Sequence, residues 1–427
     1  MQQQKIFNKT LWILLAINIL NFYDRQVVGS LTEPLRRDFQ LSDTQIGLLG
    51  SAFTWLYAIV GLPLGRAADA WNRKTLLAGG VTIWSAMTAF AGISTTYSEL
   101  MISRLGVAIG EAVCAPAAAS WIGDQYPPDQ RSKPMSIFML GVPIGISLSL
   151  FLSGPIAQAF GWRIAVMAAA APALLMVPAV LWMKEPARGA SEAHLGPIAK
   201  SSAWSVLRIP TMWWIILSGG LVNFVMYTIS TFVPALLSRV HHLSLAETGL
   251  VTGAALAVGG ISGGVIAASV GDKIIMKRRD GRMLSGAITA VCVVPASLLF
   301  IMQEPGSWLL SGIFIAITYA LLNSYYGMVY PSLQDIVPPD LRATAMAIYF
   351  LFMYALGGSF GPLITGKLSD TMAWRAAREA GSAVLTEQAK ATGLHQAMFV
   401  IPVLATGLAV VLYAGSRTIL KDSRRPV

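Results

Sequence analysis

Four charged residues lie inside long apolar stretches of this sequence, where charge is costly. Asp24 and Arg25 are adjacent within the run 11–31, and Arg104 and Glu111 lie seven residues apart in a later apolar run. A charged side chain in hydrocarbon costs at least a few kcal/mol, so it is usually found in a hydrated cavity enclosed by protein. Seven residues make about two helical turns, which places Arg104 and Glu111 on one face about 10 Å apart. These residues are the candidates for ion chemistry.

Two interpretations of these charges are open. Arg104 and Glu111 could form a structural ion pair that only offsets its own desolvation. We favour a function, because both acids and both bases are confined to two helices and the other apolar runs carry no charge except at their ends. Counted inward from the membrane surface, Asp24 and Arg104 reach similar depths, so we expect them to face each other. A carboxyl that exchanges an arginine contact for isolation changes its affinity for protons. Asp24 is the expected principal proton site and Glu111 the second.

The composition identifies an integral membrane protein. Of 427 residues, 55% are hydrophobic and 12% are charged, with a mean hydropathy of +0.61, whereas soluble domains carry about 25% charged residues. The net charge of +10 is interpreted as a topology signal rather than as a sign of nucleic-acid binding. Cys114 and Cys292 fall in separate apolar runs, so neither a disulfide nor a metal site is expected. The first apolar run is too long for a secretory signal and lacks a cleavage pattern.

Apolar runs of about 20 residues recur along the chain and predict an all-α fold with twelve membrane-spanning helices. The expected spans are 10–31, 44–65, 75–97, 99–122, 134–158, 163–183, 211–238, 246–270, 283–303, 307–333, 343–366 and 396–416. They form one bundle of six within residues 1–183 and a second within 209–418, with a cytoplasmic connector, 184–208, and a tail, 419–427. Most Lys and Arg residues outside the spans fall on one side, so both termini are expected in the cytoplasm.

A short motif occurs in both halves of the chain, after the fourth and the tenth expected spans. The first copy is Asp124, Pro127, Pro128, Asp129 and Arg131, and the second, at a constant offset of 211, is Asp335, Pro338, Pro339, Asp340 and Arg342. Loop chemistry alone is one explanation, because proline stops one helix and aspartate caps the next. Since the copies occupy equivalent places, we favour duplication of a six-helix unit, which is typical of transporters.

Other classes of function find little support. The sequence has no Gly-X-X-X-X-Gly-Lys phosphate loop, which argues against an ATP-driven pump. The four histidines, His194, His241, His242 and His395, are scattered outside the spans or at their edges, so we expect no enzyme, no cofactor and no metal. A channel would not require the repeated half. A receptor on the same fold stays an open alternative.

The loop after the second span resembles the loop signature of the major facilitator superfamily. It contains Gly65, Asp69, Arg73 and Lys74, and departs from the family form by an alanine at position 70 and an asparagine at position 72. In the family, the glycine packs helices closely, the acid caps or pairs across the bundle, and the basic residues latch the cytoplasmic face. The resemblance implies that these four residues form a cytoplasmic gate motif.

A narrower resemblance, to the spinster family of that superfamily, covers nearly the whole chain. It rests on Asn21-Phe22-Tyr23-Asp24-Arg25, Asn72-Arg73-Lys74, Trp84-Ser85, Arg104 with Gly110-Glu111-Ala112, Arg131-Ser132, Ser136-Ile137-Phe138, Pro143, Gly145 and Glu185-Pro186-Ala187-Arg188-Gly189. It implies transport of lysophospholipid-like or sphingoid-phosphate-like lipids, coupled to protons, by alternating access of two bundles. The alternative is a proton-coupled symporter of small hydrophilic organic anions.

The resemblance also implies which helices line the cavity, namely the first, fourth, seventh and tenth. The expected substrate contacts are Arg104, Arg25, Asn223, Tyr227, Asn323, Tyr326 and Tyr330. A guanidinium binds phosphate or carboxylate bidentately, whereas a structural role in helix contacts is favoured for each tyrosine taken alone. The expected partners are a small amphipathic or anionic substrate, protons and membrane lipids, without nucleic acid. We expect a monomer in the cell membrane, which is the inner membrane if the source is bacterial.

Overall fold

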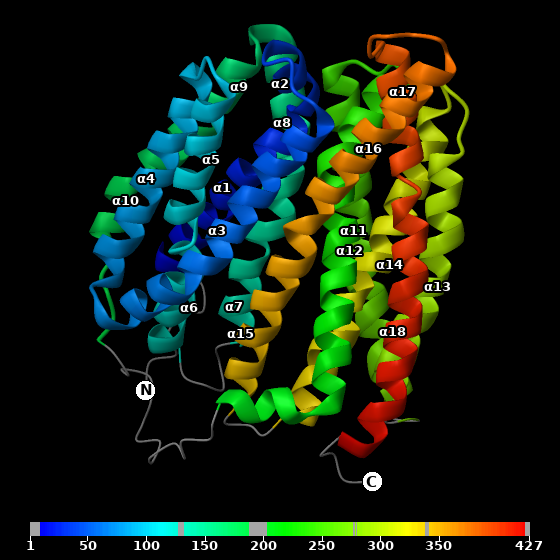
Figure 1. The fold of residues 1–427 in the computed structure, drawn as a ribbon. Coiled ribbons are helices and arrows are strands. Elements are labelled where there is room, and N and C mark those ends of the chain that lie inside the picture. Colours follow the sequence, from blue (N-terminus) through cyan, green and yellow to red (C-terminus); the bar gives the residue numbers. More distant parts are fainter. Residues whose placement is uncertain are drawn as a thin grey trace. The chain divides into compact units, whose positions relative to one another are not determined.

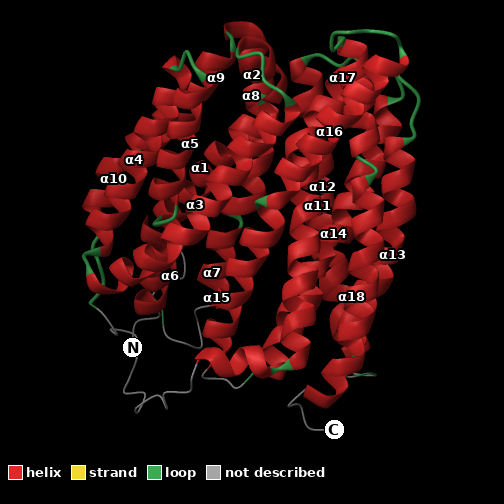
Figure 2. Ribbon diagram, viewed as in Figure 1, coloured by secondary structure: helices red, strands yellow, loops and turns green. Residues whose placement is uncertain are grey.

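The computed structural model describes residues 9–126, 132–187, 203–275, 278, 280–337 and 341–422, and within these ranges it contains helices and no strands (Figure 2). Eleven helical segments of the described chain are long and apolar enough to cross a membrane. The all-α membrane fold is therefore confirmed. Helix α1 is long enough to cross as well but is not among the eleven, because Asn18, Asn21, Asp24 and Arg25 lower its hydropathy.

The helices follow one another along the chain as labelled in Figure 1. The amino-terminal half contains α1 (Lys9–Ser30), α2 (Thr32–Asp38), α3 (Asp43–Ala70), α4 (Arg73–Ile93), α5 (Tyr97–Glu111), α6 (Cys114–Gln125), α7 (Ser132–Met139), α8 (Gly141–Phe160), α9 (Trp162–Leu175) and α10 (Val177–Trp182). The carboxyl-terminal half contains η1 (Ala203–Arg208), α11 (Pro210–Val240), α12 (Leu245–Ile275), α13 (Gly281–Ile301), α14 (Trp308–Ile336), α15 (Arg342–Phe352), the π-helical turn η3 (Met353–Gly358), α16 (Phe360–Glu379), α17 (Glu387–Ala397) and α18 (Val400–Asp422).

Five of the expected spans are interrupted rather than continuous. The breaks fall at residues 112–113, 140, 176 and 398–399, and at the π-helical turn of the eleventh span. A proline follows each within four residues, namely Pro116, Pro143, Pro178, Pro402 and Pro362. Proline has no N–H group and its ring clashes with the carbonyl four residues back, so the hydrogen-bond ladder fails there. Other prolines, such as Pro234, lie inside continuous helices, so proline favours a break without imposing one.

Contacts between Cα atoms divide the chain into two compact units. Unit 1 comprises Met1–Gln40, Ala52–Pro197 and Leu245–Gly253, and unit 2 comprises Leu41–Ser51, Ile198–Ser244 and Ala254–Val427. Two helices therefore change unit along their length. The first residues of α3 pack within unit 2, and the first residues of α12 pack within unit 1.

Glycines bring helices into close contact inside each unit. In unit 1, a Cβ added to Gly145 on α8 would lie 2.3 Å from the Ile19 carbonyl oxygen on α1. In unit 2, a Cβ on Gly259 or Gly263 of α12 would lie within 2.6 Å of an α14 carbonyl oxygen, whereas Gly264 faces open space. Real Cβ atoms do not approach this closely, so larger residues at the first three positions would push the helices apart.

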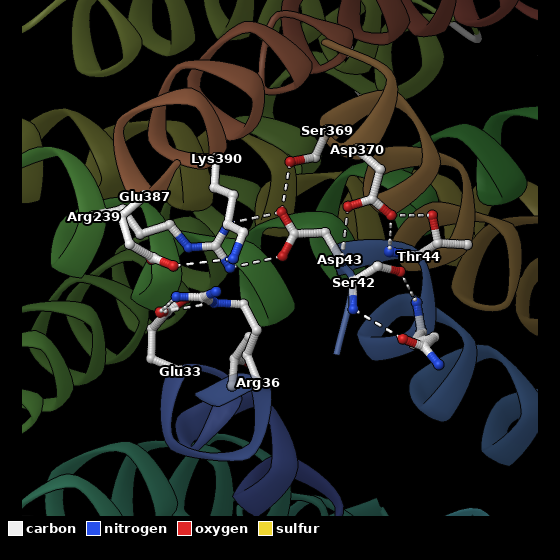
Figure 3. A network of polar contacts seen from close by, with 12 residues as sticks. Glu33, Arg36, Ser42, Asp43, Thr44, Arg239, Ser369, Asp370, Glu387 and Lys390 are labelled. Atoms are coloured by element: carbon white, nitrogen blue, oxygen red, sulfur yellow. Dashed lines mark hydrogen bonds and ion pairs between the residues drawn. The ribbon is translucent and has the colours of Figure 1, made fainter. Parts of the chain in front are cut away.

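A buried polar network holds the first turn of α3 in unit 2 (Figure 3). Both oxygens of Asp43 accept hydrogen bonds of 2.7 Å from the Arg239 guanidinium, and one accepts a third from the Ser369 hydroxyl at 2.6 Å. Asp370 accepts from the backbone N–H groups of Asp43 and Thr44 at 2.9 and 2.8 Å. A carboxylate at this position satisfies donors that a helix start leaves unpaired. The beginning of α3 is therefore fixed to α11 and α16.

Replacing Arg239 with glutamine is expected to lower the free energy of unfolding by about 3–5 kcal/mol, because a buried carboxylate loses its guanidinium partner. Thermal unfolding in detergent would measure the loss. The double variant Arg239→Gln with Asp43→Asn removes both charges and should recover most of the stability. A double variant as unstable as the single one would contradict the assigned role of the ion pair.

Candidate functional site

The four charged residues expected inside the membrane gather in unit 1. Asp24, Arg104 and Glu111 are at most 4% exposed, and they come from α1 and α5. The closest pair is Arg25 with Glu111: the guanidinium Nε donates to Oε2 at 3.1 Å, and Nη2 lies 3.1 Å from the same oxygen. The helical spacing suggested Arg104 as the partner of Glu111, and this pairing is not formed. Instead α5 ends at Glu111, and its last residue meets α1.

Asp24 is held by a threonine. The Thr88 hydroxyl on α4 donates to Asp24 Oδ2 at 2.6 Å, while Oδ1 is buried without a hydrogen-bond partner. Asp24 and Arg104 interact electrostatically, but no hydrogen bond or ion pair joins them in the described part of the chain. The contact expected between them in at least one conformation, direct or through a water molecule, is not a direct bond in this structure. Thr88 carries no sequence signal, because a threonine in an apolar run is usually bonded to its own helix.

Arg104 is the exceptional member of the group. Within the described ranges its guanidinium makes neither a hydrogen bond nor an ion pair, and its Nε is buried. Its contact is the ring of Phe53 on α3, whose centroid lies 4.9 Å from Cζ. An unpartnered buried charge is costly. The guanidinium of Arg104 keeps N–H donors that no described residue uses. Such a group can bind an anion.

Aromatic rings contact both arginines, three of them at Arg25 and the ring of Phe53 at Arg104. The Arg25 Cζ atom lies 4.4 Å from the centroid of Tyr57, 4.7 Å from that of Phe22 and 5.3 Å from that of Phe53. Ring faces attract guanidinium groups. Phe53 and Tyr57 carry no signal in the sequence, because aromatic residues on an apolar helix are indistinguishable from core residues until the neighbouring arginines are placed.

The tyrosines expected to contact substrate form an aromatic cluster in unit 2. The rings of Tyr326 and Tyr330 on α14 lie 5.3 Å apart, and Tyr330 lies 5.6 Å from Tyr349 on α15. Tyr227 on α11 meets Tyr354 of the π-helical turn at 6.4 Å. The expected residues Tyr227, Tyr326 and Tyr330 are half-buried. The resemblance missed Tyr349 and Tyr354 because they lie outside the four helices that it assigns to the cavity.

The two expected amide residues differ in what they do. Asn323 donates to the Gly260 carbonyl oxygen at 2.8 Å, which joins α14 to α12. Asn223 donates to the Gly219 carbonyl oxygen of its own helix at 3.1 Å, and its side-chain oxygen accepts from the Tyr326 hydroxyl at 3.3 Å. Asn323 thus uses a donor for helix packing, whereas Asn223 orients a tyrosine.

The gate motif centres on Arg73, which is 0% exposed. Its guanidinium lies 2.6 Å from Asp124 and 3.0 Å from Glu185, and donates to Ser120 at 3.1 Å. Lys74 is half-buried, and its backbone N–H donates a long hydrogen bond of 3.5 Å to Glu185 Oε2. The motif therefore ties α4 to the start of the connector. Residues 188–202 of the connector lie outside the described part of the chain.

Gly65 does not match the expectation. A Cβ built there would meet no described atom within 4 Å, so the close helix contact expected of it is absent among the described residues. The prediction for Asp69 stays open, because its side chain lies outside the described part. The repeated aspartates, however, share one role. Asp124 pairs with Arg73 at the start of α4, and Asp335 lies 3.2 Å from Arg282 at the start of α13. The repeated prolines and Asp129, Arg131 and Asp340 are outside the described ranges.

Replacing Glu185 with glutamine should destabilise the protein at neutral pH and much less in acid. Burial raises the pKa of this carboxyl, but hydrogen bonds from the Arg73 backbone and side chain and from the Lys74 backbone outweigh it, and the pKa lies below its ordinary value of 4.5. A lowered pKa means that the stabilisation is complete above the ordinary value and is lost as pH falls through the folded-state value. Thermal unfolding from pH 8 to 4 would test this. A gap between wild type and variant that stays constant across the range would contradict it.

Comparison with known proteins identifies the fold. A family model described as Major Facilitator Superfamily matches residues 14–362. The chain belongs to this superfamily. The transporter is 33% identical over 365 residues to an MFS-type efflux pump of Mycolicibacterium smegmatis, with 84% of each chain covered. It is 29% identical over 393 residues to Protein spinster homolog 1 of Homo sapiens, covering 84% of this chain and 72% of the relative.

A solved structure supports the same assignment. The bacterial homolog of the human lysosomal transporter Spinster, in an inward-facing and unoccupied conformation, matches this transporter with a TM-score of 0.88 and 27% identity, over 100% of both chains. The resemblance to the spinster family is thereby confirmed. The chain is a multi-pass membrane transporter of the spinster type.

Proposed function

We propose that this transporter moves amphipathic lipids with an anionic headgroup, of the lysophospholipid or sphingoid-phosphate type, in exchange for or together with protons. The observation that carries the proposal is Arg104, a buried guanidinium without hydrogen bond or ion pair in the described chain. A guanidinium stays charged in any such environment and has two parallel donors for a phosphate or carboxylate. Arg104 is the anion-binding residue in this proposal.

The carboxyl groups beside it support proton coupling. Asp24 and Glu111 each have one buried oxygen without a hydrogen-bond partner, Oδ1 and Oε1 respectively. An oxygen of this kind can carry a proton without losing an existing bond. Binding of an anion to Arg104 would change the electrostatic field at both acids, which links substrate to protons. Asp24 is the proposed principal proton site and Glu111 the second.

The proposed substrate class rests on the chemistry of the side chains. The half-buried tyrosines of unit 2, Tyr227, Tyr326 and Tyr330, offer apolar rings with polar tips, which suit an amphipathic molecule. Small hydrophilic organic anions are the alternative class, because Arg104 would bind a carboxylate equally well. We further propose that the bundles 1–183 and 209–418 move in alternating access and that the protein is active as a monomer. Both termini would lie on the cytoplasmic side of the cell membrane, which is the inner membrane if the source is bacterial.

Purified protein in proteoliposomes would test the function. Radiolabelled 1-oleoyl lysophosphatidate and labelled lactate would be offered separately, with a pH gradient of either direction and with none, and protein-free liposomes would serve as the control. We expect gradient-dependent movement of the lysophosphatidate and none of the lactate. Movement of lactate alone would establish the alternative class, and failure of both at every gradient would overturn the proposal.

A further inference from the structure

The ring of Phe53 contacts both arginines of the charge cluster. Its centroid lies 4.9 Å from Arg104 Cζ and 5.3 Å from Arg25 Cζ, and the side chain is 3% exposed. The two cations differ in their other contacts. Arg25 is paired with Glu111, whereas the ring of Phe53 is the described contact of the Arg104 guanidinium. A ring face attracts a guanidinium without using any of its N–H donors.

Acceptors for Arg104 exist nearby but are not used. Asp24 Oδ1 and Glu111 Oε1 are buried and lack hydrogen-bond partners, as does Arg104 Nε. Each of these unsatisfied groups is costly, and a direct bond between Arg104 and either carboxylate would relieve two of them at once. The described contact of the guanidinium is instead the ring of Phe53.

We propose that Phe53 is a positioning residue for the anion site: its ring holds the Arg104 guanidinium apart from Asp24 and Glu111, so that its donors remain available to substrate. This inference rests on the proposed anion site and adds a residue on α3 that the spacing of the charges did not indicate. It also explains how a buried cation persists beside two vacant carboxylate oxygens.

Helix α3 gives the ring a connection to unit 2. Residues 41–51 belong to unit 2 and Phe53 to unit 1. Ser51, two residues before the ring, donates its hydroxyl hydrogen bond to the Ser359 carbonyl oxygen, and Asp370 holds the first turn through Thr44. Phe53 therefore lies on the same continuous helix as the residues that Ser359 and Asp370 contact.

Kinetic variants test the ring. With 1-oleoyl lysophosphatidate as the probe, Phe53→Leu should raise KM about 30-fold, the factor that corresponds to a desolvated cation–π contact, and leave kcat nearly unchanged. Phe53→Trp should retain a KM near that of the wild type. Phe138→Leu is the matched control, because Phe138 is a fully buried ring of unit 1 within its apolar core. Equal KM increases in Phe53→Trp and Phe53→Leu would overturn the role of the ring.

A second arm requires no substrate. A cryo-electron microscopy structure of Phe53→Leu bound to an antibody fragment should show Arg104 within hydrogen-bond distance of Asp24 or Glu111. Wild-type side-chain positions in that variant would overturn the inference, even if lysophosphatidate transport is confirmed. Conversely, the Phe53→Leu structure could show Arg104 bonded to Asp24 or Glu111 while the wild type fails to transport lysophosphatidate. That result would support the positioning role of Phe53 and reject the proposed substrate class.

Discussion

Substituting lysine for Arg104 should reduce lysophosphatidate transport on the order of 100-fold, nearly as much as substituting alanine, because a lost charged hydrogen-bonding group costs about 1.5–3 kcal/mol. Lysine keeps the positive charge but presents a compact ammonium instead of a planar fork. The structure gives the fork two specific features. It is held by a ring rather than by an acid, and its Nε is buried without a partner. A lysine would neither stack in the same way on Phe53 nor reproduce bidentate binding.

The measurement is initial uptake at equal membrane abundance of each variant. Arg163→Lys is a suitable control, because Arg163 is 42% exposed and pairs with Asp38 at 2.6 Å, away from the charge cluster. Transport restored by Arg104→Lys to most of the wild-type rate would show that a point charge is enough, and the bidentate role would be wrong.

The membrane class, and the burial of the charged residues now found together in unit 1, were predictable from the sequence, because apolar composition and the energetic cost of a buried charge can both be judged from residue types. Apolar runs can be recognised without a structure, and charges within them stand out for the same reason. The partners of those charges were not predictable. Whether Glu111 meets Arg25 or Arg104 depends on the rotation of α1 against α5 and on the end of α5 at Glu111. A difference of one helical position changes side-chain direction by about 100°.

The repeated motif shows the same limit. Its constant offset indicated a duplicated half, but the roles of Asp124 and Asp335 required the arginines at the starts of α4 and α13, which lie far away in sequence. Residues without an unusual type, such as Thr88 and Phe53, gave no signal at all. They became visible only when the structure placed a carboxylate or guanidinium beside them.

Substituting asparagine for Asp24 is expected to abolish accumulation driven by a pH gradient while sparing exchange of substrate at equilibrium. Asparagine has nearly the shape of a protonated aspartate and cannot titrate. Its side-chain oxygen can still accept the hydrogen bond that Thr88 donates at 2.6 Å to Asp24 Oδ2. The amide group would occupy the place of Oδ1, the oxygen that has no partner in the wild type. The variant therefore mimics the protonated state permanently, and the protein can bind substrate without coupling it to protons.

Two assays on the same proteoliposomes separate coupling from binding. Net accumulation of labelled lysophosphatidate under a pH gradient should vanish in Asp24→Asn, and exchange of internal for external lysophosphatidate without a gradient should continue. Asp38→Asn is the control, because Asp38 is 41% exposed and lies outside the cluster. If the pH dependence of the wild type persists in Asp24→Asn, the proton site moves to Glu111, whose Oε1 is the other vacant oxygen beside Arg104. Testing Glu111→Gln in the same two assays would then decide whether protons are coupled at all, because no third carboxyl of the described chain interacts electrostatically with Arg104.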